Sequence, residues 1–444
     1  MFNRRIVDYL FKWKDKKGRK PLVLRGARQV GKTSAILMFA RRYFENVIYL
    51  NMEKVEHQRL FRGEISLADF EKIIRIEFRQ KIIPGKTIIF IDEIQNSVGL
   101  IKLLRFFYEE RPELHIISAG SLLQAKIEKE GLSLPVGRVE NAYLYPLDFF
   151  EYLDAKGETE LLNFLKTLSF EENIPDGIHR KALNLFYEYT MVGGMPEVVK
   201  TFLEGANIEH LNNIYSSLLT GYAEDVYKYS SLANAKYLTF VIETAPLYAG
   251  TNISYEKFGG SNFRSREMNR AFDLLEKVML VYQAKATKST DIPLVPQRKR
   301  PKKLLFLDVG LVNYRMGIQE KFLGLKDLND FYRGRIAEQI VGQNILSQYM
   351  NQAAQIFYWA KGKPEGRAEV DFCLTKGGII LGIEVKSGSS NRLKSLGSFG
   401  MLAKDALLLR IYSGILKKGN IRINSKNIPL VSIPFYLVTR ILDV

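Results

Sequence analysis

A glycine-rich run near the start of the chain carries the residues with the clearest chemistry. Gly26 and Gly31 enclose four residues and are followed by Lys32 and Thr33, which fits the pattern G-x-x-x-x-G-K-[ST]. Glycines permit the tight turn in which backbone N–H groups point at phosphate oxygens. Lys32 would reach the β- and γ-phosphates of a nucleotide, and the Thr33 hydroxyl would bind Mg²⁺. The residues expected to contact ATP in this run are Gly26, Ala27, Arg28, Gln29, Val30, Gly31, Lys32, Thr33 and Ser34.

Two adjacent carboxylates, Asp92 and Glu93, end an apolar stretch that begins at Lys86. A continuous apolar run of this length is typical of a strand buried on both faces of a parallel sheet. Asp92 would hold Mg²⁺ through its water shell, and Glu93 would polarise the attacking water. With Lys32 earlier in the chain, these residues predict ATP hydrolysis.

A third apolar run, residues 114–117, leads into the polar stretch 118–121. A polar side chain at this strand end would be placed to sense the γ-phosphate, so Ser118 and Ser121 are candidates, and Ser121 joins the expected ATP-binding residues. A simple turn is the other interpretation of the same residues.

Two strands with alternating polarity are expected at residues 368–375 and 379–387. A two-residue turn at Gly377-Gly378 would join them and set the register of the hairpin. In that register Asp371 stands directly opposite Glu384. Opposed Cβ atoms lie about 5 Å apart, and like charges there destabilise a sheet unless a cation offsets them.

We therefore expect a divalent metal ion, Mg²⁺, at Asp371 and Glu384. Lys386 lies two residues farther along the same face, about 7 Å away, where it would orient the attacking water or stabilise charge on a phosphate. Glu338, in a helix-like run with a glycine one turn before it and one turn after it, would complete the site. The alternative is a degenerate fold that keeps the hairpin and binds without cutting.

Several sequence blocks also carry a family resemblance. The blocks are Gly26–Thr33, Phe90–Gln95, Gly137-Arg138 with Tyr145–Phe149, Tyr189–Glu197 and Phe306–Leu311. Together they resemble a prokaryotic family of AAA-superfamily ATPases with a poorly characterised C-terminal domain, over nearly the whole chain. The resemblance implies that Arg138 stands where an arginine finger or sensor acts, whereas the residues themselves leave an ordinary surface arginine equally open. The D…E-x-K hairpin resembles restriction-endonuclease-like nucleases, in which a glutamate such as Glu338 often lies on the helix before the sheet.

The elements that position these residues follow from the alternation of strands and helical segments. Five strands are expected at residues 21–24, 47–51, 86–91, 114–117 and 142–145, which indicates a doubly wound parallel sheet. Residues 151–230 carry apolar stripes at helical spacing and would form a helical lid over the nucleotide.

A basic amphipathic helix is expected to begin after Ser265, as its N-cap. Strands around a basic loop at residues 298–303 follow it, so residues 236–306 suggest a winged helix-turn-helix whose second helix would enter a DNA major groove. A module that serves only for packing between domains is the alternative. The basic side chains at issue on the helix are Arg264, Arg266, Arg270 and Lys277.

Composition supports a polyanionic partner. The 444 residues carry 65 Lys and Arg against 48 Asp and Glu, a net charge of +17, which divides into +10 for residues 1–50, −8 for 51–250 and +15 for 251–444. No apolar run is long enough for a membrane span, and the first residues do not form a signal peptide. A single cysteine permits no internal disulfide, and the four histidines match no ligand spacing, so we expect a cytoplasmic protein.

The expected fold class is α/β, in four domains. These are a P-loop ATPase core (1–155), a helical lid (156–230), a winged-helix-like module (231–305) and a mixed α/β restriction-endonuclease-like domain (306–444). Nucleotide state, with ATP and Mg²⁺ as cofactors, would control a C-terminal half that binds DNA, with Mg²⁺-dependent cleavage as a further hypothesis. The alternatives are an ATP-dependent DNA-binding regulator without nuclease activity and a P-loop switch for protein partners. A homo-oligomer is a further possible assembly of this chain.

Overall fold

The chain folds into two units that each have their own internal contacts. The structure is a computed structural model that describes residues 1–121, 123, 126, 131, 133–229, 232–319, 334–362, 368–386, 393–423 and 426–444. The first unit comprises Met1–Tyr145 with the short segments Lys277–Met279 and Tyr349–Ala353. The second comprises the rest of the described chain.

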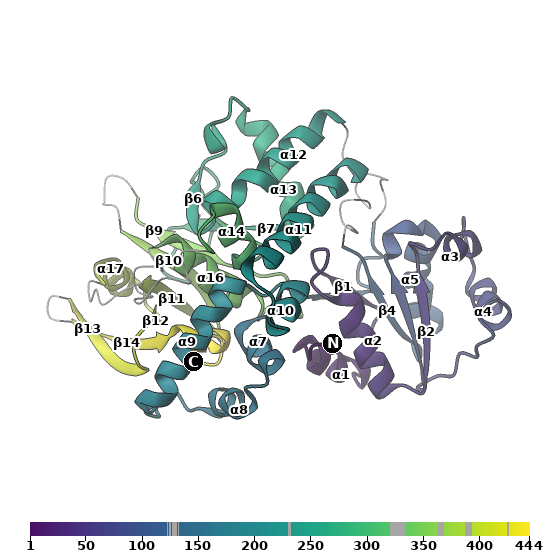
Figure 1. Cartoon of the computed structure of the whole chain (residues 1–444), viewed down its shortest axis with the longest axis horizontal. Coiled ribbons are helices and arrows are strands. Elements are labelled where there is room, and N and C mark those ends of the chain that lie inside the picture. The colour runs from purple at the N-terminus through teal and green to yellow at the C-terminus, as the bar shows by residue number, and fades with distance from the viewer. Residues whose placement is uncertain are drawn as a thin grey trace. The chain divides into compact units, whose positions relative to one another are not determined.

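A five-stranded sheet forms the centre of the first unit, in the order β2-β3-β4-β1-β5 (Figure 1). All of its pairings are parallel, as the sequence predicts. Every residue of β3 is buried, because this strand has neighbours on both sides and helices over the sheet. The strands are β1 (Leu22–Arg25), β2 (Asn46–Asn51), β3 (Thr87–Asp92), β4 (His115–Ala119) and β5 (Glu140–Tyr143).

Helices bury the apolar side chains of this sheet. Phe70 and Leu100 share one core with Ile89 of β3, which places α4 and α5 against the sheet. Because α2 begins directly after the glycine-rich loop, its first turn lies at the end of β1. The helices of this unit are α1 (Ile6–Lys14), α2 (Lys32–Tyr43), α3 (Val55–Leu60), α4 (Leu67–Ile76) and α5 (Val98–Glu110).

Residues 149–229 are mainly helical, as expected. Helices α9 and α11 both pack against α14 (Val309–Met316), and α9 also packs against the short helix η5 (Phe435–Arg440). These helices therefore share contacts with the C-terminal half, and their role as a lid over the nucleotide stays a prediction. They are α7 (Phe149–Lys156), α8 (Thr159–Thr167), α9 (Asp176–Val192), α10 (Pro196–Leu203) and α11 (Ile208–Tyr229).

A nine-stranded mixed sheet runs through the second unit, in the order β13-β14-β12-β11-β10-β9-β7-β8-β6 (Figure 1). Its strands are β6 (Thr251–Ile253), β7 (Val281–Thr287), β8 (Lys302–Phe306), β9 (Phe357–Ala360), β10 (Glu369–Lys376), β11 (Ile379–Lys386), β12 (Ala406–Tyr412), β13 (Lys417–Ile423) and β14 (Lys426–Pro434). Because β7 pairs in parallel with β9, strands expected in the winged module and in the nuclease-like region belong to one sheet. The fourfold division of the chain stays a prediction.

Four helices accompany this sheet. The helix α16 (Arg335–Leu346) packs against β8 and β11, and α17 (Lys394–Leu402) packs against β10, β11 and β12. The helices α12 (Leu232–Thr244) and α13 (Ser265–Lys277) precede β7. The carboxylate of Glu267 accepts the backbone N–H of Arg264 at 2.8 Å, whereas the Ser265 hydroxyl bonds to Glu256, so the expected N-cap role of Ser265 is wrong.

The hairpin β10–β11 has the register that its turn predicts. Lys376 pairs with Ile379, and Phe372 pairs with Ile383. Both turn glycines have positive φ, 55° at Gly377 and 85° at Gly378, as a two-residue hairpin turn with primed geometry requires. The register follows from the turn length because each pair along an antiparallel ladder sets the next one.

A buried carboxylate, Asp308, joins two sequence blocks that lie far apart in the chain. Its Oδ2 accepts the N–H of Gly194 at 2.6 Å and the side-chain amide of Gln343 at 3.0 Å. Its Oδ1 accepts the N–H of Gly310 at 2.9 Å and caps the start of α14. The loop before α10 approaches so closely that a Cβ at Gly193 would lie 2.2 Å from Asp308 Oδ1. The glycines of both blocks thus make room for one hydrogen-bonded junction.

Replacement of this carboxylate by an amide, Asp308→Asn, should destabilise the second unit by about 2–4 kcal/mol. One acceptor oxygen becomes an NH₂ group that faces N–H donors. Gln343 cannot reverse its amide to compensate, because its Oε1 accepts the N–H of Val309 at 2.8 Å. Urea denaturation measures the loss of unfolding free energy.

Asp291→Asn is the matched control, because that carboxylate is exposed and pairs with Lys404, whose side chain is 81% exposed. Its effect should stay within about 0.5 kcal/mol. Equal effects of the two substitutions would contradict the role given to Asp308.

Candidate functional site

The glycine-rich loop lies between the end of β1 and the start of α2. Gly31 has a φ of 92°, and a Cβ at Gly26 would lie 2.5 Å from the carbonyl oxygen of Leu144. Both positions therefore require glycine. Gln29 also adopts a positive φ of 63°, which helps the loop to turn back on itself. The first turn of α2 leaves its backbone N–H groups free of intrahelical partners, as an anion site needs.

Lys32 is buried beneath this loop. Its side-chain ammonium donates to the carbonyl oxygens of Gly26 at 3.0 Å and Ala27 at 2.8 Å. Burial lowers the pKa of Lys32 to about 8, although Glu93 and Asp92 oppose the shift. The loop carbonyls thus hold the ammonium at the position where a phosphate would approach.

Thr33 and Asp92, the two residues expected to hold Mg²⁺, are in direct contact, and their role as a metal site stays a prediction. The Thr33 hydroxyl donates to Asp92 Oδ2 at 2.7 Å, and the Tyr49 hydroxyl donates to the same oxygen at 3.1 Å. Burial raises the pKa of Asp92. A hydroxyl and a carboxylate are ligands that Mg²⁺ prefers, so this pair fits the ion that the motif implies.

Glu93 is held by a residue that the sequence reasoning did not select. The side-chain amide of Gln95 donates to the Glu93 carboxylate, and Glu93 itself has a φ of 50°. Gln95 is buried, and its Oε1 lies so close to Gly120 that a Cβ there would be 2.0 Å away. Gln95 therefore connects the end of β3 to the end of β4. It belongs to the Phe90–Gln95 block, which was the only signal for it.

Arg4 supports the loop from the N-terminal segment and was also missed. Its guanidinium donates to the carbonyl oxygen of Val30 at 2.7 Å and to that of Tyr145 at 2.6 Å, and the side chain is buried. Nothing in the local sequence separates this arginine from its basic neighbours. Arg4 therefore stabilises the glycine-rich loop through its hydrogen bond to the Val30 carbonyl.

The remaining N-terminal candidates have varied surroundings. The Ser118 hydroxyl donates to the carbonyl oxygen of Leu22 and is part of the sheet, whereas Ser121 is buried just beyond β4. Ser34 is exposed in the first turn of α2. Arg138 is half-buried, donates to Glu109 at 2.7 Å and lies over the ring of Tyr108. Its role as an arginine finger stays a prediction.

Two of the three carboxylates expected to form a nuclease site, together with Glu369, which was not expected there, lie around a lysine. Lys303 Nζ lies 2.6 Å from Glu338 Oε2, 3.3 Å from Asp371 Oδ1 and 3.5 Å from Glu369 Oε1, and its side chain is 2% exposed. These carboxylates raise the pKa of Lys303 against the opposing effect of burial. Lys303 had been expected on a basic DNA-contacting loop, so it is the principal residue that sequence reasoning misplaced.

Glu384 and Lys386 form a second pair within the same region. Lys386 Nζ lies 2.6 Å from Glu384 Oε1, while Glu384 Oε2 is buried without a hydrogen-bond partner. Asp371 Oδ2 accepts the N–H of Val385 at 2.8 Å. Burial and the neighbouring Asp371 raise the pKa of Glu384 to about 7. In the described ranges, no three His, Cys, Asp or Glu side chains converge to hold a metal ion.

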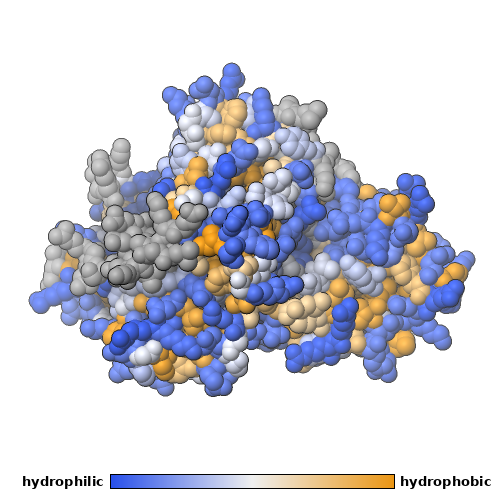
Figure 2. All heavy atoms as spheres, in the orientation of Figure 1, coloured by the Kyte–Doolittle hydropathy of each residue, from blue (hydrophilic) through white to orange (hydrophobic). Residues whose placement is uncertain are grey.

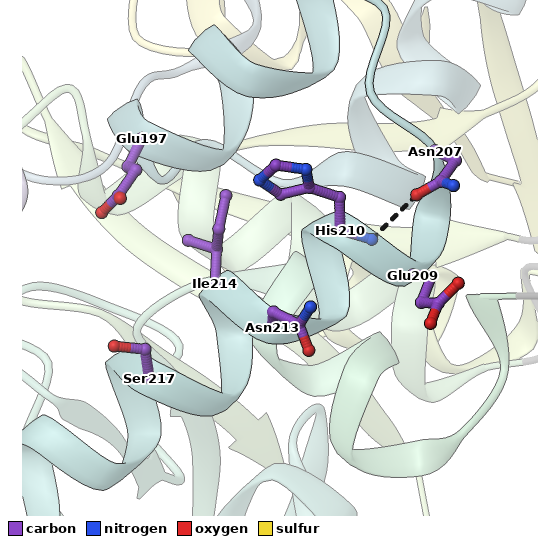
Figure 3. Close-up of a pocket in the computed structure, with 7 residues that line it drawn as sticks. All are labelled: Glu197, Asn207, Glu209, His210, Asn213, Ile214 and Ser217. Atoms are coloured by element: carbon purple, nitrogen blue, oxygen red, sulfur yellow. Dashed lines mark hydrogen bonds between the residues drawn. The ribbon is translucent and has the colours of Figure 1, made fainter.

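A hollow in the surface lies apart from these clusters. The face in Figure 2 is mainly hydrophilic, with hydrophobic side chains in small separate patches. Within the part of the chain that the structure describes, no helix has the length and apolar character needed to cross a bilayer. The hollow, of about 440 Å³, lies between α10 and α11 and contains none of the expected site residues (Figure 3). It is lined by Glu197, Asn207, Glu209, His210, Asn213, Ile214 and Ser217.

Sequence comparison identifies the N-terminal region. Residues 18–153 match a family model described as an AAA domain. The match supports a P-loop ATPase fold of the AAA type for this region, which we call the AAA domain. Residues 183–321 and 333–436 match two domains of unknown function, DUF8612 and DUF4143, whose descriptions name no activity.

A curated relative matches a short part of the chain. The chaperone protein ClpB of Mycoplasma pneumoniae is 36% identical over 103 residues, which are 22% of this chain and 14% of the relative. The chain thus covers about a seventh of the length of that curated relative.

Among solved structures, the RuvB Holliday junction branch migration motor of Thermotoga maritima is 15% identical. That match covers 64% of this chain and 90% of RuvB, with a TM-score of 0.30. The ORC1 protein of Aeropyrum pernix, in complex with DNA, is 14% identical over 72% of this chain and 92% of ORC1, with a TM-score of 0.27. TM-scores this low do not establish a common arrangement.

ATP binding to the AAA domain should weaken as the pH rises above about 8. Burial lowers the pKa of Lys32 to about 8, and only the ammonium form attracts a phosphate. Below that pH Lys32 is already protonated. Above it, Lys32 must take up a proton when the nucleotide binds, which weakens the observed affinity. The dissociation constant should therefore rise by up to about tenfold per pH unit.

Fluorescence titration with a nucleotide analogue from about pH 7 to about pH 9.5 measures this dependence. The Lys32→Arg variant keeps its charge over that range, so its affinity should not share the dependence. A wild-type dissociation constant that is constant over the range would contradict the assignment.

Proposed function

We propose that this chain binds and hydrolyses ATP in its AAA domain, and that nucleotide state controls DNA binding by its C-terminal half. The contact between Thr33 and Asp92 is the observation that carries the first part. It brings the last residue of one strand against the first turn of α2, where Lys32 is already held by loop carbonyls. Phosphate-binding, cation-binding and water-activating groups then belong to one edge of a parallel sheet.

The roles of the residues follow from their present partners. The N–H donors of Lys32 would pass from two loop carbonyls to phosphate oxygens, and the N–H groups of residues 29–34 would surround the phosphates. Mg²⁺ held by Thr33 and Asp92 would neutralise phosphate charge. Glu93 would accept a hydrogen bond from the attacking water once Gln95 releases its carboxylate.

The proposed DNA-binding surface is the outer face of α13 and the loop before β8. Met268, Phe272 and Leu275 are buried on one side of α13, whereas Arg266 and Arg270 are exposed on the other. The order α12, β6, α13, β7, β8 is that of a winged helix, which presents such a helix to a major groove.

Only part of the basic loop is available for DNA. Arg298 and Lys299 are exposed. Arg300 instead donates to the backbone of residues 360 and 361, and Lys302 donates to Tyr255. We propose binding without cleavage, because Lys303 already pairs with Glu338 and Asp371, two of the carboxylates that a nuclease would use.

The Glu93→Gln variant should bind ATP with nearly wild-type affinity but hydrolyse it at least about 100-fold more slowly, because an amide does not activate water as a carboxylate does. Phosphate release and nucleotide titration measure the two effects. Glu110→Gln, which changes an exposed carboxylate at the end of α5, should leave both unchanged. Equal turnover in Glu93→Gln and wild type would exclude Glu93 as the residue that activates water.

Nucleotide control of DNA binding is tested with the same variant. Glu93→Gln loaded with ATP should differ from the nucleotide-free chain in its affinity for DNA.

The double variant Arg266→Ala/Arg270→Ala should bind duplex DNA more weakly. If each arginine contacts one phosphate, the slope of log affinity against log salt should fall by about 2. Fluorescence anisotropy over a salt series, with a metal chelator present, measures both quantities. Lys166→Ala/Lys200→Ala removes the same charge from exposed positions on α8 and α10 and should change the slope little. A wild-type chain that binds no form of DNA would favour a switch for protein partners instead.

A further inference from the structure

The strand β8 inserts a lysine among the carboxylates of the nuclease-like region. Lys303 pairs with Asn252 of β6 on one side and with Ala284 of β7 on the other, so its backbone is fixed in the middle of three strands. Its ammonium lies 5.3 Å from the ring centroid of Phe372 and 5.7 Å from that of Tyr358. The side chain has almost no access to water.

We propose that Lys303 is the permanent counter-cation of Glu338, Asp371 and Glu369, in the place that a divalent metal ion would need. An ammonium has three N–H donors, and the three carboxylates lie 2.6 to 3.5 Å from its nitrogen. The chain itself thus places a positive charge where a metal ion would lie, and offsets one of the three negative charges. This inference extends the proposed binding without cleavage and is independent of ATP hydrolysis.

A metal ion could not enter without expelling Lys303 from its partners. A divalent ion coordinated by the same oxygens would lie within a few ångströms of the ammonium, and like charges repel strongly in a buried region. The fixed strand and the neighbouring rings leave Lys303 little opportunity to reach water. A buried ammonium without partners is strongly unfavourable.

The other oxygens of the region do not form a cage for a hard cation. Asp371 Oδ2 is taken by the N–H of Val385, and Glu384 Oε1 is taken by Lys386. Glu384 Oε2 is the one buried carboxylate oxygen among the described site residues without a hydrogen-bond partner. Mg²⁺ and Mn²⁺ take about six ligands in near-octahedral geometry, and carboxylate oxygens already engaged by Lys303, Lys386 and the N–H of Val385 do not supply such a set.

Binding of Mn²⁺ without nucleotide or DNA tests this proposal. All chains carry Asp92→Asn, so that the AAA domain contributes little, and free Mn²⁺ is followed by electron paramagnetic resonance. The reference chain should not bind Mn²⁺ below about 1 mM. Addition of Lys303→Met should create one site that binds at least about tenfold more tightly. Addition of Asp371→Asn to that variant should abolish the site, whereas Lys303→Arg should not create it.

Two outcomes would overturn the proposal. In the first, the reference chain binds Mn²⁺ and loses that binding when Asp371→Asn or Glu384→Gln is added. The site would then bind a metal ion while Lys303 is still present. The other outcome is a folded Lys303→Met variant that gains no Mn²⁺ site. Thermal melting establishes folding, and Mn²⁺ should raise the melting temperature of Lys303→Met but not of the reference. Loss of DNA binding in chelator, by contrast, would contradict only the DNA-binding proposal.

Discussion

A charge that is removed from water must find its partners inside the protein, and this constraint shapes every functional region of the chain. Asp308 meets it with backbone N–H groups and one side-chain amide, and thereby joins α14 to the loop before α10. Lys32 meets it with two carbonyl oxygens, and Lys303 meets it with three carboxylates. The close glycine contacts around Asp308 follow from the need to bring those donors together.

The two buried lysines differ in what their partners permit. The carbonyls that hold Lys32 are neutral, so a phosphate offers a stronger partner and can displace them without leaving a charge unpaired. The partners of Lys303 are half-buried carboxylates, so separation leaves the buried ammonium uncompensated. The arrangement around Lys32 is suited to a ligand that binds reversibly. The arrangement around Lys303 is suited to a permanent structure, which is why we treat one as a nucleotide site and the other as a closed ion cluster.

The same constraint separates structural basic residues from those available to a partner. Arg4 and Arg300 donate to backbone carbonyls, and Lys303 is enclosed, so these charges do not contribute to an external surface. Arg266 and Arg270 lie exposed on one side of α13. The basic character of the C-terminal half is therefore less uniform than the net charge suggests, and the proposed polyanion surface includes the exposed arginines of α13.

Sequence alone determined the phosphate loop, the strands of the parallel sheet and the register of the β10–β11 hairpin. Each depends on neighbours in the chain: a turn of fixed length sets which residues pair, and an apolar run sets which strand is buried. Tertiary structure decided the partners of Lys303, the junction at Asp308, the bond from Gln95 to Glu93 and the support that Arg4 gives to the loop. Lys303 and Asp371 are separated by 68 residues. No local pattern shows which strands enclose a charged side chain, and that enclosure decides whether it meets water or another residue.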